Sequence, residues 1–430
     1  MKKNHKYDWV IVGGGASGIA VAEILCREGK SVLLIEKNSQ IASETTKVFH
    51  EWFHSGSLYS LLPDNLLTLR YLLGATDDLL EYYSGFSRMN LSPTESGLSG
   101  NGNGNGNGNG NGTEGWFNQD RIEYKYRIRK LNPIWMSLVS RSINVIDMIN
   151  NHDWLRRRAG SEYDRSKLML KHAFNCIPKQ IFSSKGFHSI LSPDLTINSR
   201  ILISDLISVA ISRGLEVITS ESVTSIEETK DIVSIKTLTG FYEADNVVIC
   251  SPDVMSDIFN IPIKTGFAPI AVVENITDDE NSFVELDYYP KKCINLLKKS
   301  GGIGQAGGVT ISNKKDIKPY LNYIIAEHKK RNPEIKVVDS YVGLKKELVQ
   351  KGENRNYLYH INKHSPRVWS IVLGKFTLAF SMAPEFYRRA YHRNPTKHVN
   401  KDITLVDNDL ISKTSWQEII DNKEAQSGND

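Results

Sequence analysis

A glycine-rich turn between an apolar segment and a helical segment constrains this chain more than any other feature. Residues 8–12 read Asp-Trp-Val-Ile-Val, and the pattern Gly13-x-Gly15-x-x-Gly18 follows them directly. In a strand–turn–helix unit, Gly13 permits the tight turn, Gly15 lets a pyrophosphate approach the backbone, and Gly18 lets the helix pack on the strand. The start of the helix presents free N–H groups and a positive dipole end to phosphates. The sequence therefore predicts a dinucleotide site.

The residues after the turn support the same prediction. The helix is expected to end at Gly29, and a second apolar strand ends on Glu36, eighteen residues after Gly18. A carboxylate at this strand end accepts hydrogen bonds from a ribose diol and repels the 2′-phosphate of NADP. The alternative, a glycine-rich turn that binds nothing, is disfavoured because strand, helix and acidic strand end occur in register. NAD and FAD both stay open at this point.

Composition limits the class of protein. A chain of 430 residues with 40% hydrophobic residues can bury a full core, and we expect two domains. The net charge of +4 is too small to imply a nucleic-acid partner. The first strand begins within the first ten residues, so we expect no signal peptide, and no apolar run reaches the ~18 residues of a membrane helix. We expect a soluble protein without a transmembrane segment, although peripheral membrane contact stays open.

The cysteines are far apart and show no CxxC spacing, which is typical of reduced thiols in a cytoplasmic protein without a metal site. They are Cys26, Cys176, Cys250 and Cys293.

The order of periodic segments predicts an α/β fold. Helical periodicity over residues 201–214 is followed by short strand-like runs up to residue 250, and strand-then-helix patterns return at 337–343 and 357–380. We predict a Rossmann-like βαβ domain with a central parallel sheet and a β-meander, discontinuous over 1–74, 191–255 and 336–398. Residues 75–190 and 256–335 would form a mixed α+β substrate domain.

Other segments are expected to carry no chemistry. The Asn-Gly alternation from Asn101 to Gly112, within the polar stretch 92–115, predicts a flexible surface insertion. Residues 399–430 are polar and predict a mobile tail.

Three further segments could suggest ligand sites but favour plainer interpretations. The alternating basic run 121–130 is typical of a strand with one solvated face, and Arg156-Arg157-Arg158 of a solvated surface; in both cases a nucleic-acid strip is the alternative. The glycine-rich run 301–308 lacks a strand-before, helix-after context, so we expect a turn of the substrate domain and not a phosphate loop.

Four elements, taken in order, resemble the FAD-dependent D-amino-acid oxidase superfamily, including its glycerol-3-phosphate and L-2-hydroxyglutarate dehydrogenase branches. The first is the N-terminal fingerprint. The second, residues 43–59, resembles the Ser/Thr-rich turn and the His-small-Gly element of those dehydrogenases. The third, residues 195–250, resembles the second FAD-contacting unit, and the fourth, residues 364–377, the strand-to-helix turn that meets the flavin. The resemblance covers about two thirds of the chain and implies FAD as the cofactor.

The resemblance also implies which residues contact FAD. The N-terminal motif and the Ser/Thr-rich turn would hold the ADP half and the phosphate or flavin edge, Val223 would offer its backbone to the adenine, and a helix start would face the flavin N1–C2=O side. The implied positions are Gly13, Gly15, Ala16, Ser17, Gly18, Glu36, Lys37, Thr45, Thr46, Val223, Gly374, Lys375, Phe376 and Thr377.

His54 is the main catalytic candidate. When a flavin accepts a hydride from an alcohol, a base must take the hydroxyl proton, and a neutral imidazole suits that role. A purely structural histidine is the alternative, and His50 or His54 could instead attach covalently to the flavin, as in some relatives. Arg367 and Lys345 are candidates to hold a substrate carboxylate or phosphate.

Together these observations predict an oxidoreductase with noncovalent FAD. It would transfer a hydride from a small anionic substrate, such as a 2-hydroxy acid, an amino acid or a polyol phosphate, to flavin N5, and pass electrons to an acceptor that the sequence does not identify. One alternative is an FAD-dependent modifying enzyme of a biosynthetic pathway with a larger substrate, which would suit the poorly matching middle of the chain. Another is a flavin-binding protein with little catalysis, because His54-Ser-Gly56 and Ser251-Pro-Asp253 depart from the family pattern.

Overall fold

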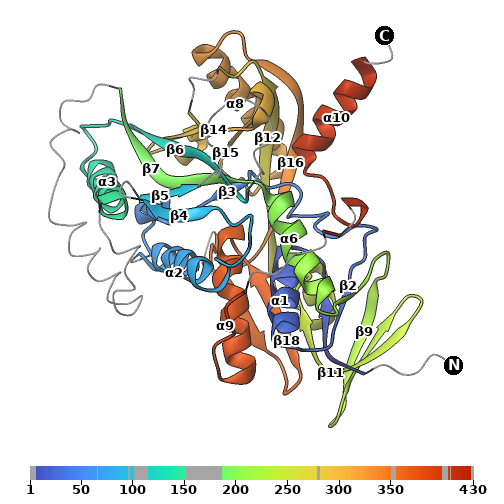
Figure 1. Ribbon diagram of the computed structural model, residues 1–430. Coiled ribbons are helices and arrows are strands. Elements are labelled where there is room, and N and C mark those ends of the chain that lie inside the picture. Colours follow the sequence, from blue (N-terminus) through green and yellow to red (C-terminus); the bar gives the residue numbers. More distant parts are fainter. Residues whose placement is uncertain are drawn as a thin grey trace.

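Two eight-stranded sheets carry the fold. The computed structural model describes residues 6–64, 66–94, 97–100, 115–151, 186–277, 281–349, 355–399, 405–406 and 408–427. Figure 1 shows one sheet with its helices in the lower part of the molecule and the second sheet above it.

The first sheet has the order β17-β18-β11-β1-β2-β8, and β9 and β10 extend from β11 as an antiparallel meander. Strand β1 runs parallel to β2 and β11, and β11 runs parallel to β18. The strands are β1 (Lys6–Val12), β2 (Val32–Ile35), β8 (Glu216–Ile218), β9 (Val223–Glu228), β10 (Val233–Thr237), β11 (Phe241–Ile249), β17 (Tyr359–Lys363) and β18 (Val368–Leu373).

Successive side chains of β1 point to opposite faces of the sheet, and apolar residues are buried on both faces. Trp9 and Ile11 pack among helices α1 (Ala16–Arg27), α6 (Ser199–Ser212) and α9 (Ala379–Tyr391). Val10 and Val12 pack on the other face, against the β9–β10 meander and α7 (Pro252–Phe259). Parallel strands buried on both faces read as continuous apolar runs. The predicted Rossmann-like α/β fold with a meander is confirmed.

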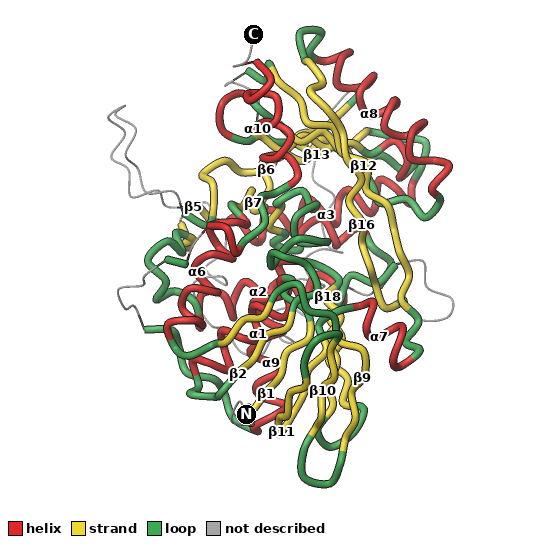
Figure 2. The backbone as a smooth tube through the Cα atoms, turned by 90° about the vertical axis from the view of Figure 1, so that its right-hand side faces the viewer, coloured by secondary structure: helices red, strands yellow, loops and turns green. Residues whose placement is uncertain are grey.

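The second sheet is mostly antiparallel and has the order β16-β12-β15-β14-β13-β6-β7-β3. Figure 2 shows its long strands β12 and β16 running down toward the first sheet, with α8 (Ile317–Arg331) on the outside. Its strands are β3 (Trp52–Phe53), β6 (Phe117–Arg127), β7 (Phe187–Ile197), β12 (Ile263–Glu274), β13 (Phe283–Leu286), β14 (Ile294–Lys298), β15 (Gly304–Gly308) and β16 (Lys336–Leu348).

The remaining elements fill the surroundings of the two sheets. Helix α2 (Leu67–Tyr82) packs beside α9, and α3 (Pro133–Asn151) packs against β7 and the short helix η1 (Ser57–Leu61). The other elements are the hairpin β4 (Leu91–Thr94) and β5 (Gly97–Gly100), the short helices η3 (Pro290–Lys292), η4 (Ser300–Gly302), η5 (Lys314–Asp316), η6 (Phe376–Leu378) and η7 (Asn408–Leu410), and α10 (Ser415–Ser427).

Two strands lie in a different sheet from the one that the sequence pattern suggests. Strand β16 pairs along its length with β12, and β7 pairs with β6 and β3, so both belong to the second sheet. The sequence pattern predicts instead that residues 336–348 of β16 and 191–197 of β7 belong to the nucleotide-binding domain. Apolar periodicity identifies a strand but does not identify its partner, which explains the difference. The division into domains stays a prediction.

The described part of the polar segment 399–430 includes a helix, which the prediction of a mobile tail did not anticipate. Residues 415–427 form α10, although their composition is polar. Specific pairs hold this segment: the Trp416 indole N–H donates to Glu51, and Lys423 forms an ion pair with Glu274. Such pairs involve residues more than a hundred positions away and leave no periodic signal in the tail itself.

The other low-complexity and basic segments have separate outcomes. The run 121–130 lies largely in strand β6, with Ile122, Tyr124 and Tyr126 buried, so the predicted strand is confirmed. Run 301–308 is a short turn that continues into β15. The Asn-Gly run and Arg156–Arg158 lie outside the described residues. In the described part of the chain, no helix has both the length and the apolarity needed to cross a membrane.

Candidate active site

A cavity of about 740 Å³ lies between the two sheets, at the carboxyl ends of β1, β2 and β11. This edge is where open α/β sheets bind their ligands. Most of the predicted site residues line this cavity: Gly13, Gly15, Ala16, Ser17, Glu36, Lys37, Thr45, Thr46, His54, Val223, Lys345, Gly374, Lys375 and Phe376. The exceptions are Gly18, Arg367 and Thr377.

The three motif glycines have different local reasons. Gly13 has φ +107°, a backbone conformation that favours glycine. A Cβ on Gly18 would lie 2.0 Å from the carbonyl oxygen of Gly13, so Gly18 serves the packing of helix on strand. A Cβ on Gly15 would meet nothing closer than the hydroxyl of Thr46, at 3.6 Å. The space in front of Gly15 is therefore open to a ligand.

Glu36 braces the turn and also borders the cavity. One oxygen of its buried carboxylate accepts a hydrogen bond from the Gly14 N–H at 2.7 Å, and the other accepts from the Asn38 N–H at 2.9 Å. A carboxylate has more acceptor sites than these bonds use. The acidic strand end can thus hold its own turn and still receive a ribose hydroxyl.

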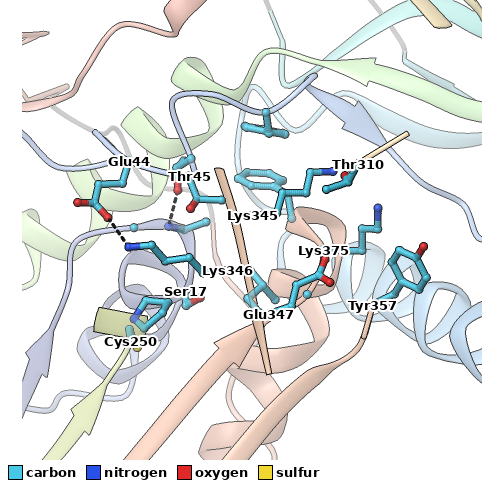
Figure 3. A pocket seen from close by; sticks show the side chains of 18 of the residues that line it. Ser17, Glu44, Thr45, Cys250, Thr310, Lys345, Lys346, Glu347, Tyr357 and Lys375 are labelled. Carbon is cyan, nitrogen blue, oxygen red and sulfur yellow. Dashed lines mark hydrogen bonds and ion pairs between the residues drawn. The ribbon is translucent and has the colours of Figure 1, made fainter. Parts of the chain in front are cut away.

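Residues 43–46 form the wall of the cavity opposite the turn. The Ala16 N–H at the start of α1 donates to the hydroxyl of Thr46 at 3.0 Å. Lys37 pairs with Glu44 at 2.6 Å and with Asp253 at 3.0 Å. Figure 3 shows Glu44, Thr45 and Lys346 at this end of the cavity. Thr45 itself donates to the carbonyl of Leu344.

The turn from β18 into α9 forms another wall. A Cβ on Gly374 would lie 2.4 Å from the carbonyl oxygen of Leu358, so only glycine fits there. Phe376 stacks on Phe49 with ring centroids 4.7 Å apart. The buried Thr377 hydroxyl accepts the backbone N–H of His54 at 3.0 Å. The Thr377 side chain therefore holds the backbone of His54, Thr377 is not among the residues that border the cavity, and its contact with FAD stays a prediction.

These features fit an FAD molecule. The open space at Gly15, the start of α1 and the acidic strand end match the ADP half, and the Gly374 turn lies on the same cavity. Within the described residues, the buried Ser43 hydroxyl has no hydrogen-bond partner, as expected for a group that awaits a ligand.

His54 is enclosed at the edge of the same cavity. Its ring packs on Trp52 with centroids 4.4 Å apart. Nδ1 lies 3.5 Å from Asp194 Oδ2, and Nε2 lies 3.4 Å from the Tyr59 hydroxyl. Burial lowers the pKa of His54 to about 4, although Asp194 acts in the opposite direction. The imidazole is neutral at physiological pH and can accept a proton.

Asp194, on β7, is a site residue that the sequence analysis missed. This fully buried carboxylate accepts hydrogen bonds from the Trp52 indole at 2.7 Å, the Ser55 N–H at 2.8 Å and the Tyr124 hydroxyl at 2.5 Å. Burial raises its pKa, but the interactions with His54, Ser55 and Tyr124 outweigh burial and hold the pKa below its usual range. The one available signal was a single acidic residue within the strand β7.

Positive charge gathers at the other side of the cavity. Figure 3 shows Lys345, Lys375 and Tyr357 around one space. In the described chain neither lysine has a carboxylate within ion-pair distance; the ammonium of Lys375 instead lies 4.9 Å from the centre of the Tyr357 ring. Arg355 also borders this space and is paired with Glu347 at 2.7 Å. Lys345, Lys375 and Arg355 therefore gather positive charge around the carboxylate of Glu347.

The pKa directions reflect this crowding of charge. Burial, and then the nearby Arg355, lower the pKa of Lys345 to about 8. Burial, and then Lys345, lower the pKa of Lys375 well below its ordinary value. An anion in this space would relieve the repulsion and favour the charged forms. Arg355 and Glu347 carry no local sequence motif, so the sequence analysis did not find them.

Arg367 does not belong to the site. Its guanidinium donates to the carbonyls of Asp245 at 2.9 Å and Lys230 at 3.2 Å. Arg367 directly precedes the parallel strand β18, so it lies at the amino end of this strand, whereas the cavity lies at the carboxyl ends. The prediction that Arg367 holds a substrate anion is therefore wrong.

His50 borders the cavity but lies against the second sheet. A Cβ on Gly307 would come within 2.1 Å of His50 Nε2, so the glycine of β15 makes room for this ring. Burial, followed by Lys345, lowers the pKa of His50 well below its ordinary value. Noncovalent binding of FAD stays the prediction, and covalent attachment at His50 or His54 stays its alternative.

Comparisons with known proteins agree with this geometry. A family model described as "FAD dependent oxidoreductase" matches residues 8–105. UDP-galactopyranose mutase from Mycoplasma pneumoniae is 39% identical over 56 residues, which are 11% of this chain and 14% of the mutase, so the chain matches only a small part of that curated relative.

Solved structures resemble the chain over nearly its whole length. L-α-glycerophosphate oxidase from Mycoplasma pneumoniae, solved with FAD bound, has a TM-score of 0.61 at 14% identity. The match covers 94% of this chain and 100% of the oxidase chain. NikD, an amino acid oxidase of nikkomycin biosynthesis, has a TM-score of 0.60 at 14% identity, covering 96% and 98%. L-proline dehydrogenase from P. horikoshii has a TM-score of 0.60 at 13% identity, covering 92% and 96%. At such identities these likenesses establish the fold.

The fold and the cavity define a flavin-binding α/β protein. Residues 8–105 match the FAD-dependent oxidoreductase family model, and the whole fold is that of solved FAD-dependent oxidases, so both findings indicate FAD as the cofactor.

Proposed function

We propose that the protein oxidises a small anionic substrate at a carbon that bears a hydroxyl or an amino group. The observation that carries this proposal is the grouping of Lys345, Lys375 and Arg355 on the same cavity as the neutral imidazole of His54. A carboxylate or phosphate would bind on the cationic side, with its reacting carbon toward the histidine. The similar structures named above include oxidases and dehydrogenases of amino acids and of glycerophosphate, which supports the same substrate classes.

Bound FAD would supply the hydride acceptor of the reaction, at flavin N5. The residues that border the cavity at the first sheet and at the Gly374 turn would hold this cofactor. The enclosed site would exclude water and strengthen the electrostatic contacts of the anion.

His54 would accept the proton of the substrate hydroxyl or amine at Nε2. Its neutral state leaves one ring nitrogen free to accept, and Asp194 beside Nδ1 favours the tautomer with the proton on Nδ1. Once the ring is protonated, the carboxylate of Asp194 stabilises the imidazolium. The Nδ1–Oδ2 and Nε2–Oη distances are 3.5 and 3.4 Å, and we expect both contacts to shorten when substrate binds.

The test is a reduction assay on the purified protein. We expect a bound flavin, seen in the absorption spectrum, that loses its colour when anaerobic protein is mixed with a suitable donor. The donors form a panel of 2-hydroxy acids, amino acids and polyol phosphates, each with an uncharged analogue such as the ester or the free polyol as a matched control. At least one anion should reduce the flavin much faster than its neutral analogue. If no anion reduces it, the proposal is wrong, and a larger substrate or a non-catalytic flavin protein takes its place.

A further inference from the structure

Residues 410–423, which we call the C-terminal strap, lie along residues 41–51, which we call the cofactor loop. The Ile41 N–H donates to the carbonyl of Leu410 at 3.0 Å, and the Ser412 N–H donates to the carbonyl of Ile41 at 3.1 Å. Further along, the Ser415 N–H donates to the carbonyl of Lys47 at 3.1 Å. The backbone of the strap is thus hydrogen-bonded to both ends of the Ser/Thr-rich turn.

Side chains add a second set of contacts between the strap and the rest of the molecule. Lys47 pairs with Glu418 at 2.6 Å, and Lys423 pairs with Glu274 at the end of β12. Figure 1 shows α10 beside β16 at the upper right. These ion pairs are partly exposed, and exposed pairs contribute little individually.

The buried contact of the strap is with Glu51, at the end of the cofactor loop. One carboxylate oxygen of Glu51 accepts from the Trp416 indole at 2.8 Å and from Lys299 at 2.6 Å. The other accepts from the N–H and the hydroxyl of Ser199, at the start of α6. Glu51 has φ +57°, a conformation that a non-glycine residue keeps only when its surroundings hold it. Glu51 is only 3% exposed, so water cannot reach its carboxylate, and these protein donors take the place of water.

The cofactor loop is also the segment that borders the cavity. It contributes Ser43, Thr45, Thr46 and His50 to the cavity wall, and Thr46 accepts from the start of α1. No described residue of the strap borders the cavity itself. Any effect of the strap on a bound dinucleotide must therefore pass through the cofactor loop.

We propose that the C-terminal strap is a cofactor-retention element, which keeps the cofactor loop closed over bound FAD. Moving the loop outward separates Trp416 from Glu51 and breaks the backbone pairs at Ile41 and Lys47. A hydrogen bond to a buried carboxylate contributes about 1.5–3 kcal/mol, equivalent to roughly a 10- to 100-fold change in an equilibrium or rate. The proposal depends on the FAD site but not on the substrate proposed above.

The test compares FAD release from two tryptophan variants of the holoprotein. Trp416→Phe removes the indole donor to Glu51 and keeps an aromatic ring. Trp135→Phe is the matched control, because its indole donates over 2.7 Å to the carbonyl of Arg127, a partner outside the cofactor loop and the strap. FAD release is followed by the fluorescence of the free flavin, at a temperature where circular dichroism shows both variants folded.

We expect Trp416→Phe to release FAD about 10- to 100-fold faster than the wild type, and Trp135→Phe to release it at nearly the wild-type rate. A purely structural role of Trp416 would lower the melting temperature of Trp416→Phe and leave its rate of FAD release at the wild-type value. Equal release rates for Trp416→Phe and the wild type would overturn the proposal. Glu51→Gln provides a second variant, and its release rate should rise as well, because a neutral amide is a weaker acceptor. Since no substrate is present, this result is independent of the reduction assay.

Discussion

Individual residues of the cavity divide its chemistry into proton transfer and anion binding. His54 and Asp194 form one pair at one side, and at the other lie Lys345 and Lys375, which have no ion-pair partner among the described residues. Burial is the main cause that lowers the pKa of His54, Lys345 and Lys375, which leaves the imidazole neutral, and a bound anion would favour the charged forms of the two lysines. Burial thus supports proton acceptance by His54 and anion binding by the two lysines.

Lys345 should give the reaction its alkaline limit. The pKa of Lys345 is about 8, so its charge is present below pH 8 and is lost as the pH rises through that value. The second-order rate constant of flavin reduction by an anionic donor should therefore fall on the alkaline side of about pH 8, and on the acid side only near the His54 pKa of about 4. Stopped-flow reduction over this pH range measures it.

Lys345→Met should remove the alkaline limit and weaken donor binding about 10- to 100-fold. Lys346→Met is the matched control, because the neighbouring lysine pairs with Asp253 and should leave the alkaline limit in place. An unchanged alkaline limit in Lys345→Met would show that another group titrates.

At the scale of elements, the β1–turn–α1 unit separates packing from cofactor binding. A methyl group at Gly18 meets a backbone oxygen at 2.0 Å, whereas one at Gly15 meets only a hydroxyl at 3.6 Å. Gly15 also has an ordinary extended backbone, with φ −80°. The two positions are three residues apart, yet an added methyl group would clash with the backbone at Gly18 and would enter the ligand space at Gly15.

Gly18→Ala should therefore destabilise the fold, by about 1–3 kcal/mol as for other overpacked sites. Gly15→Ala should leave the stability of the FAD-free protein nearly unchanged but place a methyl group where the pyrophosphate would approach. Thermal melts of the FAD-free proteins and flavin titrations separate the two effects. If Gly15→Ala bound FAD as tightly as the wild type, the pyrophosphate would not lie at this turn.

Elements built from residues close together in the chain could be predicted from the sequence, whereas contacts between distant residues could not. The glycine spacing and the short apolar segments depend on residues that are close together in the chain. The dinucleotide unit, α6, the meander and the β18-to-α9 turn could therefore be predicted. Asp194, Arg355 and the strap residue Trp416 act on partners far away in the chain, and no local pattern records such contacts. Arg367 was misassigned because a basic residue beside a strand carries no information about the end of the sheet at which it lies.

At the scale of the whole molecule, the cavity is shared between the two sheets. The first sheet supplies the glycine-rich turn and the acidic strand end for the cofactor. The second sheet supplies β16 with Lys345, β7 with Asp194 and β3, which directly precedes His54. The proposed chemistry therefore depends on the way these sheets meet, and a change on the second sheet should affect the reaction without removing FAD.

The most direct measurement is the single-turnover rate of flavin reduction in His54→Gln, mixed anaerobically with the donor found in the panel. The account predicts a rate about 10²- to 10⁴-fold below the wild type at equal FAD content. Asp194→Asn should be slower in the same direction, since a neutral amide stabilises the imidazolium less. A wild-type rate in His54→Gln, with FAD bound and the protein folded, would contradict the assignment of His54 as the proton acceptor.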